Sequence, residues 1–268
     1  MRLDKKVAIV TGSSSGLGRA IAVRYSNEGA LVVCADLSPT ARSQVPEELE
    51  ITTHEAIQRA GGRAIFVATD VGDAVAVEQM VQAAVKEFGR LDIIVNNAGV
   101  ALETRRPGKI HETDEDLWDT TMRVNAKSVF LGCKYATAQM LRQEPHESGD
   151  RGWIINMSSI CGTIGTLDTP SYCASKGAVS NLTRQVALDY AADRIHVNAI
   201  CPGYTQTAIF REVTASNLMA VEALQRKHPL KGPGVPDDIA KMAVVLASED
   251  ASWMTGACVA VDGGYTAR

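Results

Sequence analysis

The sequence predicts an α/β fold with a doubly wound, parallel sheet of seven strands and helices on both faces. Seven short apolar runs alternate with longer amphipathic segments along the 268 residues. Strands separated by helices of this length form right-handed βαβ units in a parallel sheet. The apolar runs are continuous rather than alternating, which indicates that both faces of the sheet are covered. No repeat or linker divides the chain, so we expect a single domain over residues 1–268.

The expected strands are short, apolar and rich in β-branched residues. They are Val7–Val10, Leu31–Ala35, Arg63–Val67, Leu91–Val95, Trp153–Asn156, Ile195–Ala199 and Ala257–Val261. The expected helices have apolar residues at helical spacing. They are Leu17–Glu28, Ala74–Phe88, Glu115–Leu141, Ala174–Ala191 and Asp237–Ala247.

Three polar segments interrupt this alternation. Leu37–Thr53 contains two prolines and Gln143–Gly152 is charged, and we expect both to be surface loops. Tyr204–Pro236 is a long connection that follows the end of an expected strand. Ligands of doubly wound sheets bind outside the carboxyl ends of the strands, so residues 204–236 are expected to form a substrate lid.

The composition excludes several classes of protein. The chain has 27 Lys and Arg against 31 Asp and Glu, a net charge of −4, whereas nucleic-acid binding requires a basic face. No apolar run approaches the roughly 18 residues that span a bilayer, so we expect no membrane association. The six cysteines are scattered, which favours reduced thiols and a cytoplasmic location. The five histidines show no metal-ligand spacing, so no metal is expected.

A glycine-rich turn follows the first expected strand, in the segment Thr11–Gly18. Glycines permit a tight turn and let backbone N–H groups approach a pyrophosphate, and the following helix adds partial positive charge. An ordinary strand-to-helix turn is the alternative, but the position between a strand and a helix favours dinucleotide binding. The residues expected to contact the cofactor here are Gly12, Ser14, Ser15, Gly16, Leu17 and Gly18.

Asp36 ends the second expected strand, eighteen residues after Gly18. A carboxylate at this place accepts hydrogen bonds from the adenosine ribose hydroxyls and repels a 2′-phosphate. Ser15, Leu37 and Ser38 offer no compensating cation, so Asp36 and Leu37 predict NAD(H), with NADP(H) the less favoured cofactor. The alternative is that Asp36 only caps the strand end.

Two further strand ends carry polar residues that could face the same ligand. Asp70 and Val71 follow the third strand and are expected near the adenine. Asn97, Ala98 and Gly99 follow the fourth strand, and glycine there would allow close approach of the cofactor. Turn formation alone is the alternative interpretation of both segments.

Ser159, Tyr172 and Lys176 form the candidate catalytic group. Tyr172 and Lys176 are four residues apart, so they share one face of a helix, and Ser159 lies thirteen residues before Tyr172 at a strand end. Tyrosine is a weak base at neutral pH, with an unperturbed pKa near 10. A nearby ammonium favours the phenolate, which can exchange a proton with an alcohol while the serine holds the substrate oxygen.

With these motifs the sequence resembles the short-chain dehydrogenase/reductase family, in its single-domain Rossmann branch, over nearly its whole length. The resemblance implies that Tyr172 is the acid/base and that Ser159 positions the substrate. It also implies that Lys176 tunes Tyr172 and binds the nicotinamide ribose, while Asn125 holds a water of a proton relay. The resemblance further places Pro202, Gly203, Thr205 and Thr207 beside the cofactor and implies a homotetramer. Leu37–Thr53 and Gln143–Gly152 look longer than the family pattern.

We therefore expect an NAD(H)-dependent oxidoreductase that interconverts a secondary alcohol and its ketone by hydride transfer. The alternatives are an NADPH-linked 3-oxoacyl or ketone reductase, and a dinucleotide-binding sensor or scaffold without catalysis. Asp36 argues against the first alternative and the intact Ser159, Tyr172 and Lys176 set argues against the second. The segment Cys161–Pro170 favours an uncharged, moderately apolar and cyclic substrate.

Overall fold

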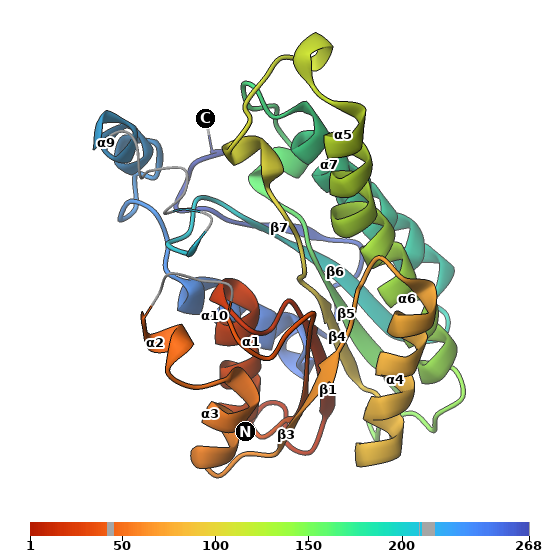
Figure 1. Ribbon diagram of the computed structural model, residues 1–268. Helices are drawn as coiled ribbons and strands as arrows, with labels where there is room; N and C mark the ends of the chain where they lie inside the picture. Colours follow the sequence, from red (N-terminus) through yellow and green to blue (C-terminus); the bar gives the residue numbers. More distant parts are fainter. Residues whose placement is uncertain (42–45, 209, 211–217, 268) are drawn as a thin grey trace.

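The computed structural model describes residues 1–41, 46–208, 210 and 218–267, and a seven-stranded parallel sheet forms its centre (Figure 1). The strand order is β3-β2-β1-β4-β5-β6-β7. This confirms the predicted doubly wound α/β fold. The strands are β1 (Val7–Thr11), β2 (Leu31–Asp36), β3 (Ala64–Ala68), β4 (Ile93–Asn96), β5 (Gly152–Met157), β6 (Ile195–Pro202) and β7 (Cys258–Val261).

The chain changes direction across the sheet at β1. This strand pairs with β2 on one side, with Val7 opposite Leu31, and with β4 on the other, with Ala8 opposite Ile93. The chain therefore leaves β1 towards one face of the sheet and leaves β4 towards the other face, both at the carboxyl edge. In doubly wound folds this switch point is where a ligand binds.

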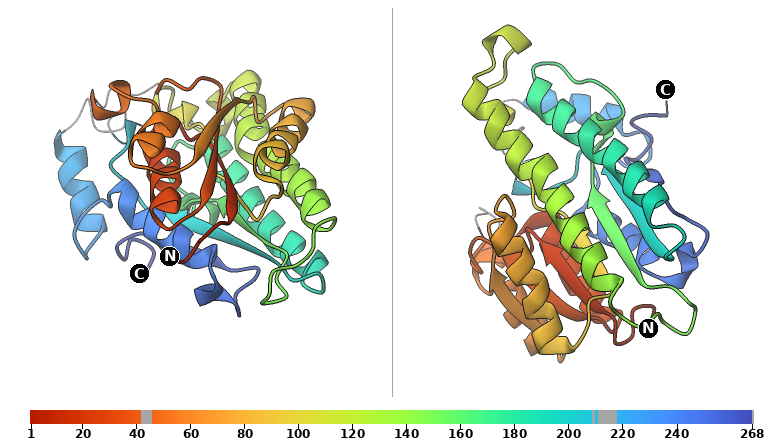
Figure 2. Two further views of the ribbon diagram at one scale, coloured as in Figure 1. Left: turned by 90° about the horizontal axis from the view of Figure 1, so that it is seen from below. Right: turned by 90° about the vertical axis from the view of Figure 1, so that its right-hand side faces the viewer.

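Two layers of helices cover the sheet, and Figure 2 shows them from two further sides. One face packs against α1 and α10, with α3 beside α1, whereas α4, α6 and α7 cover the other face. The helices are α1 (Gly16–Asn27), α2 (Pro46–Leu49), α3 (Thr53–Arg59), α4 (Ala74–Phe88), α5 (Glu115–Met122), α6 (Ser128–Met140), α7 (Pro170–Asp189), α9 (Leu218–Lys227) and α10 (Pro236–Leu246).

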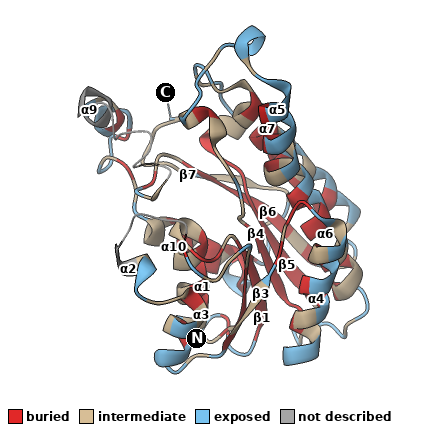
Figure 3. Ribbon diagram, in the orientation of Figure 1, coloured by how far each residue is buried: buried red, intermediate tan, exposed pale blue. Residues whose placement is uncertain are grey.

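The apolar core lies on both sides of the central strands β1, β4, β5 and β6, which are almost wholly buried, whereas the outer strands β3 and β7 are mostly half-buried (Figure 3). Ile21 and Tyr25 of α1 pack with Val244 of α10 in one cluster. Met80 of α4 and Met140 of α6 belong to the other cluster. Burying one such side chain contributes about 1.5–3 kcal/mol. The sheet is therefore a rigid support for the loops at its edges.

The structure differs from the sequence prediction in two long helices. The predicted helix Glu115–Leu141 is interrupted by a wide π-helical turn at Arg123–Lys127, which separates α5 from α6. Such turns are not visible in hydrophobic periodicity, because the apolar face continues through them. Helix α7 begins at Pro170 rather than Ala174, because proline is favoured in the first turn of a helix.

The three polar segments agree with their predicted structures to different extents. Residues 37–53 were expected to be a loop, but they include the short helix α2 and the first residue of α3. Residues 143–151 form a loop as expected, with Gly152 already in β5. The expected lid segment contains α9, whereas residues 209 and 211–217 lie outside the described part. Among the described helices, none combines the length and apolarity that crossing a bilayer requires.

A polar cluster is buried at the amino edge of the sheet, opposite the switch point. The Asp92 side chain is 0% exposed and accepts hydrogen bonds from the Val7 N–H at 2.8 Å and the Arg90 Nε at 2.6 Å. His146 Nε2 lies 2.9 Å from the same carboxylate. Although burial opposes the charged form, these partners hold the pKa of Asp92 below its usual value. The cluster joins β1, β4 and the 143–151 loop.

Candidate active site

The glycine-rich turn between β1 and α1 brings backbone groups very close together. Gly12 has a φ of +65°, and a Cβ there would lie 2.9 Å from the Cα of Ala98. A Cβ at Gly18 would overlap the carbonyl oxygen of Gly12. Both positions therefore require glycine, and the helix can pack tightly on the strand.

The amino terminus of α1 holds an anionic group in this structure. The Gly16 N–H donates a 2.8 Å hydrogen bond to Oε1 of Glu48, while Ser15, the residue before the helix, makes no side-chain cap. A Cβ at Gly16 would lie 3.5 Å from the side chain of Thr207, which places Thr207 over the turn. The first N–H of α1 thus has a carboxylate as its partner, in keeping with the positive end of the helix dipole.

Asp36 at the end of β2 lies against the same turn. Its Oδ2 accepts from the Ser14 N–H at 3.1 Å, and its Oδ1 accepts from the Leu37 N–H at 2.8 Å. The Ser14 hydroxyl donates to the Ser38 carbonyl at 2.6 Å. The two backbone bonds fix the carboxylate beside the turn.

Asn97 and Ala98 join the end of β4 to the end of β1. The Asn97 and Ala98 N–H groups both donate to the Thr11 hydroxyl at 3.0 Å. The Asn97 amide donates to the Thr11 carbonyl at 2.8 Å and to the Gly12 carbonyl at 3.3 Å. The side chain of Asn97 thus holds the two loops together, and Gly99 continues from them towards Asn125.

Asp70 lies at the end of β3, but its carboxylate is engaged within the protein. It accepts from the Gly72 N–H at 2.9 Å and from Arg123 Nη1 at 3.1 and 3.0 Å. The Gly72 bond and the Arg123 guanidinium hold the pKa of Asp70 below its usual range. The neighbouring Val71 is buried, next to the ion pair between Asp70 and Arg123.

The structure brings Ser159, Tyr172 and Lys176 together. Ser159 follows β5 and Tyr172 lies in the first turn of α7, and the Ser159 hydroxyl is near enough to the Tyr172 phenol to lower its pKa. Lys176 Nζ lies 5.7 Å from the centre of the Tyr172 ring and donates to the Met157 carbonyl at 2.8 Å. The early start of α7 explains this placement, because it puts Tyr172 at the carboxyl edge of the sheet.

In the chain without a cofactor, burial has the largest effect on the pKa values of Tyr172 and Lys176. Burial raises the pKa of Tyr172, with Cys161 acting in the same direction, whereas the hydrogen bond from Ser159 lowers it. Burial also lowers the pKa of Lys176 to about 8. The phenol of the cofactor-free chain therefore holds its proton at neutral pH.

Asn125 is fully buried in the π-helical turn Arg123–Lys127. Its Oδ1 accepts from the Val100 N–H at 2.8 Å, and its Nδ2 donates to the Val100 carbonyl at 2.9 Å. Nδ2 also donates to the Ser175 hydroxyl at 3.1 Å. The side-chain amide therefore connects the segment after β4 to the catalytic helix α7.

The segment after β6 reaches the same edge of the sheet. Pro202 ends β6, and the Gly203 N–H donates to the Val261 carbonyl at 3.1 Å. The Thr205 hydroxyl donates to the Gly203 carbonyl at 3.1 Å. Of these predicted residues, Thr207 approaches the glycine-rich turn.

A small network of hydroxyl and thiol groups surrounds the start of α7. Thr166 Oγ1 lies 2.6 Å from Thr169 Oγ1 and 3.4 Å from Cys173 Sγ. Cys161 Sγ lies 3.6 Å from the same Thr166 hydroxyl. These contacts fold residues 161–169 back onto α7 beside Tyr172.

Sequence reasoning missed two glutamates of this region. Glu48 contacts the N–H of Gly16, and Glu103 accepts hydrogen bonds from the Ser171 and Tyr172 N–H groups. No local sequence pattern indicates either glutamate, because the N–H groups that they bind are distant in the sequence. The sequence also contains no sign of the uncapped helix start, because Thr169 before Pro170 is a favoured N-cap residue and only the structure shows that it makes no cap.

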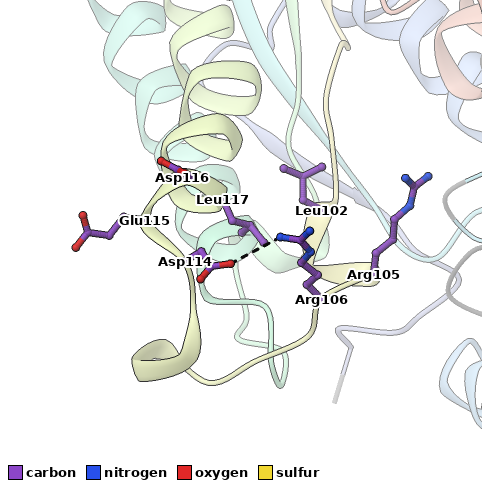
Figure 4. Close-up of a pocket in the computed structure, with 7 residues that line it drawn as sticks. All are labelled: Leu102, Arg105, Arg106, Asp114, Glu115, Asp116 and Leu117. Carbon is purple, nitrogen blue, oxygen red and sulfur yellow. Dashed lines mark ion pairs between the residues drawn. The ribbon is translucent and has the colours of Figure 1, made fainter.

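A pocket of about 590 Å³ opens on the outer side of this region (Figure 4). Arg106 and Asp114 point towards each other across it, with 3.8 Å between Nη1 and Oδ2. The residues that line it are Leu102, Arg105, Arg106, Asp114, Glu115, Asp116 and Leu117. It contains none of the candidate catalytic groups. Within the described residues no cluster of His, Cys, Asp and Glu has the makeup of a metal site.

Sequence comparison finds a family model and several dehydrogenases that match nearly the whole chain. A family model described as enoyl-(acyl carrier protein) reductase matches residues 12–266. The chain is 38% identical to cis-4-hydroxycyclohexanecarboxylate dehydrogenase of Sinomonas cyclohexanicum, over 98% of this chain and 97% of that protein. It is 36% identical to meso-2,3-butanediol dehydrogenase of Serratia marcescens, over 100% of this chain and 97% of that one.

A solved structure has the same fold. The short-chain type dehydrogenase/reductase from Mycobacterium marinum superposes with a TM-score of 0.87 at 29% identity, covering 99% of this chain and 97% of that one. The similarity thus extends over nearly the whole length in both sequence and structure. The chain belongs to the short-chain dehydrogenase/reductase family of oxidoreductases.

Proposed function

We propose that this protein is an NAD(H)-dependent oxidoreductase that interconverts a secondary alcohol and its ketone. One observation carries the proposal: Ser159, Tyr172 and Lys176 meet at the carboxyl edge of the sheet, on the side of β4 where Gly99 lies. The dehydrogenases of Sinomonas cyclohexanicum and Serratia marcescens named above support this reaction class.

Each catalytic side chain has a defined task in this proposal. A bound nicotinamide would accept or donate the hydride. Tyr172 gives its proton to the ketone oxygen in reduction and takes one from the alcohol in oxidation, and the Ser159 hydroxyl holds that oxygen. Lys176 would hold the cofactor ribose, since its Nζ lies 3.6 Å from the position of a Cβ at Gly99. Asn125 keeps α7 in register with the segment after β4.

We propose NAD(H) rather than NADP(H) as the cofactor. Asp36 is fixed by two backbone N–H groups beside the glycine-rich turn. Glu48 adds a second carboxylate at the same turn. Two negative charges in this region oppose a 2′-phosphate by Coulomb repulsion. The opposite cofactor preference would favour the NADPH-linked reductase instead.

We propose an uncharged, moderately apolar cyclic alcohol as the substrate class. Residues 161–169 present threonine and cysteine groups beside Tyr172. The relative from Sinomonas cyclohexanicum is named for a hydroxycyclohexanecarboxylate, which supports a ring-borne secondary alcohol and not the absence of charge. Residues 204–236, including α9, would cover this substrate as a lid.

The proposed oligomer is a homotetramer of these single-domain chains, in the cytoplasm. Large apolar side chains on α6 and α7 support the assembly, since Phe130 is 50% and Leu188 75% exposed in the single chain. The six cysteines are free thiols, in keeping with a reducing compartment. Sedimentation velocity of the purified protein tests the tetramer, and a monomer would contradict it.

The reaction is tested by nicotinamide absorbance with a panel of alcohols and ketones. We expect turnover with NAD⁺ by the wild type and a loss of at least 100-fold in Tyr172→Phe, since general acid–base catalysis contributes about 10²–10⁴-fold. The variant should bind NAD⁺ as the wild type does. Full turnover by Tyr172→Phe would refute the assignment, and binding of NAD⁺ without turnover of any panel member would favour a sensor or scaffold.

A further inference from the structure

Helix α7, which carries the candidate catalytic residues, begins without a cap of its own. Thr169 precedes the helix, and its side chain accepts no hydrogen bond from the backbone N–H groups of the first turn. Pro170 has no N–H, so the first N–H groups that need an acceptor belong to Ser171 and Tyr172. Unpaired buried N–H groups are costly, so their partner comes from another part of the chain.

Glu103 is that partner. Its Oε1 accepts from the Ser171 N–H at 2.8 Å, and its Oε2 accepts from the Tyr172 N–H at 2.9 Å. The side chain is 3% exposed. Both oxygens of a buried carboxylate are thus used by two successive N–H groups, at the end of the helix where its dipole favours negative charge.

The backbone around Glu103 continues directly from the cofactor side of the site. Glu103 lies in the 3₁₀ turn Leu102–Thr104, four residues after Gly99. Val100, between them, is bonded through the Asn125 amide to Ser175 of α7. The segment from Gly99 to Glu103 therefore contacts α7 at two places, about one helical turn apart.

We propose that Glu103 is a positioning residue for the reaction, which holds the Tyr172 hydroxyl in register with the segment that would face the nicotinamide. This inference rests on the proposed function, in which Tyr172 transfers the proton. Two bonds to consecutive N–H groups define both the place and the direction of the first turn, which a single cap would not do. Proton and hydride transfer to one substrate need this register to be accurate, since a displacement of about 1 Å can cost 100-fold in rate.

The variant Glu103→Gln tests whether both carboxylate oxygens are needed to position α7, or whether any polar side chain at residue 103 is enough. The amide has one acceptor oxygen, and its NH₂ group faces the second N–H instead of accepting from it. We expect kcat to fall between about 10- and 100-fold, while the Kd for NAD⁺ stays within about twofold. The deuterium isotope effect on kcat, with the alcohol labelled at its carbinol carbon, should rise because the chemical step becomes limiting.

Glu112→Gln is the matched control. Glu112 is an exposed carboxylate of the same loop, and its Oε2 accepts only the Lys109 N–H at 2.9 Å. This variant removes the same charge without contact to α7, so kcat and the isotope effect should equal those of the wild type. Amide hydrogen exchange at residues 170–173 should increase in Glu103→Gln and not in Glu112→Gln.

The outcomes distinguish the inference from the proposed function. Wild-type turnover with equal kcat and isotope effect in both variants would overturn the positioning role of Glu103. Faster amide exchange at the start of α7 without any change in kcat would also overturn it, because the glutamate would then only stabilise the helix. An inactive wild type with every alcohol would instead refute the proposed function. The assays use the full chain below the melting temperature of each variant.

Discussion

Lys176 shows how burial changes a single side chain at this site. Its ammonium is buried and bonds to one carbonyl oxygen, that of Met157, and burial lowers its pKa from 10.5 to about 8. The unfolded chain then binds more protons than the folded one between pH 8 and about 10.5. The charge of Lys176 therefore destabilises the fold below pH 8, and this effect disappears as the pH rises through that interval.

Lys176→Met is expected to remove this pH dependence. At pH 7 the variant should be more stable than the wild type by up to about 3 kcal/mol, since one pKa unit corresponds to 1.36 kcal/mol. The difference should shrink as the pH rises from 8 to about 10. Urea unfolding at several pH values measures it, and a difference that does not vary with pH would contradict the assigned cause. Turnover should be lost at every pH.

Glu48 occupies the N–H group at which a phosphate is expected to bind. Its Oε1 accepts from Gly16, whereas its Oε2 is buried without a partner. Glu48→Gln should strengthen NAD⁺ binding by about tenfold, because a charged hydrogen bond worth roughly 1.5–3 kcal/mol no longer competes for the N–H. Calorimetric titration measures the Kd, with the neighbouring exposed Glu50→Gln as control. Weaker binding by the Glu48 variant would show that the carboxylate contributes to the cofactor site instead.

At the scale of elements, the contact between β1 and α1 depends on Gly18. A methyl group at this position would overlap the Gly12 carbonyl oxygen, so Gly18→Ala must push the helix away from the strand. We expect NAD⁺ affinity to fall at least tenfold and the melting temperature to drop. Gly165→Ala is the control, because a Cβ there would have no neighbour within 4 Å. Unchanged affinity in Gly18→Ala would contradict this account.

The elements also show what the sequence could and could not predict. The seven strands and the helices α1, α4, α6, α7 and α10 follow from apolar periodicity and are confirmed, whereas α3 was not predicted. The π-helical turn at Arg123–Lys127 and helix α2 escaped prediction, because neither changes the apolar pattern. The meeting of Ser159, Tyr172 and Lys176 could be inferred from strand ends and helical spacing. The contacts of Glu48 and Glu103 could not, since they join segments that only the tertiary fold brings together.

At the scale of the whole molecule, the carboxyl and amino edges of the sheet carry different groups of polar residues. The carboxyl edge holds the candidate catalytic group, and the amino edge holds the buried cluster around Asp92. The pKa of Asp92 is held low by His146, Val7 and Arg90 against the effect of burial. The stability from this carboxylate is therefore present above its unfolded pKa and is lost as the pH falls through the lower, folded value.

Asp92→Asn should destabilise the protein without changing its chemistry. Removing one partner of a buried ion pair costs about 3–5 kcal/mol, so the urea midpoint should fall markedly at pH 7. The kcat measured on folded protein should stay within about twofold of wild type, because the cluster lies at the far edge. Asp250→Asn, which breaks an exposed pair with Arg2, should change stability by less than about 1 kcal/mol. A large loss of kcat in Asp92→Asn would show that the two edges are coupled.

The pairing of β1 has a consequence for how a newly made chain folds. On its second side β1 pairs with β4, and Ala8 lies opposite Ile93, which is 85 residues later in the sequence. This pairing cannot form until β4 has been synthesised. Contacts of such long range slow folding, and an unpaired apolar strand edge invites association between chains. During synthesis this edge is open until β4 has left the ribosome. Slower expression at low temperature, or added chaperones, should therefore raise the yield of active enzyme.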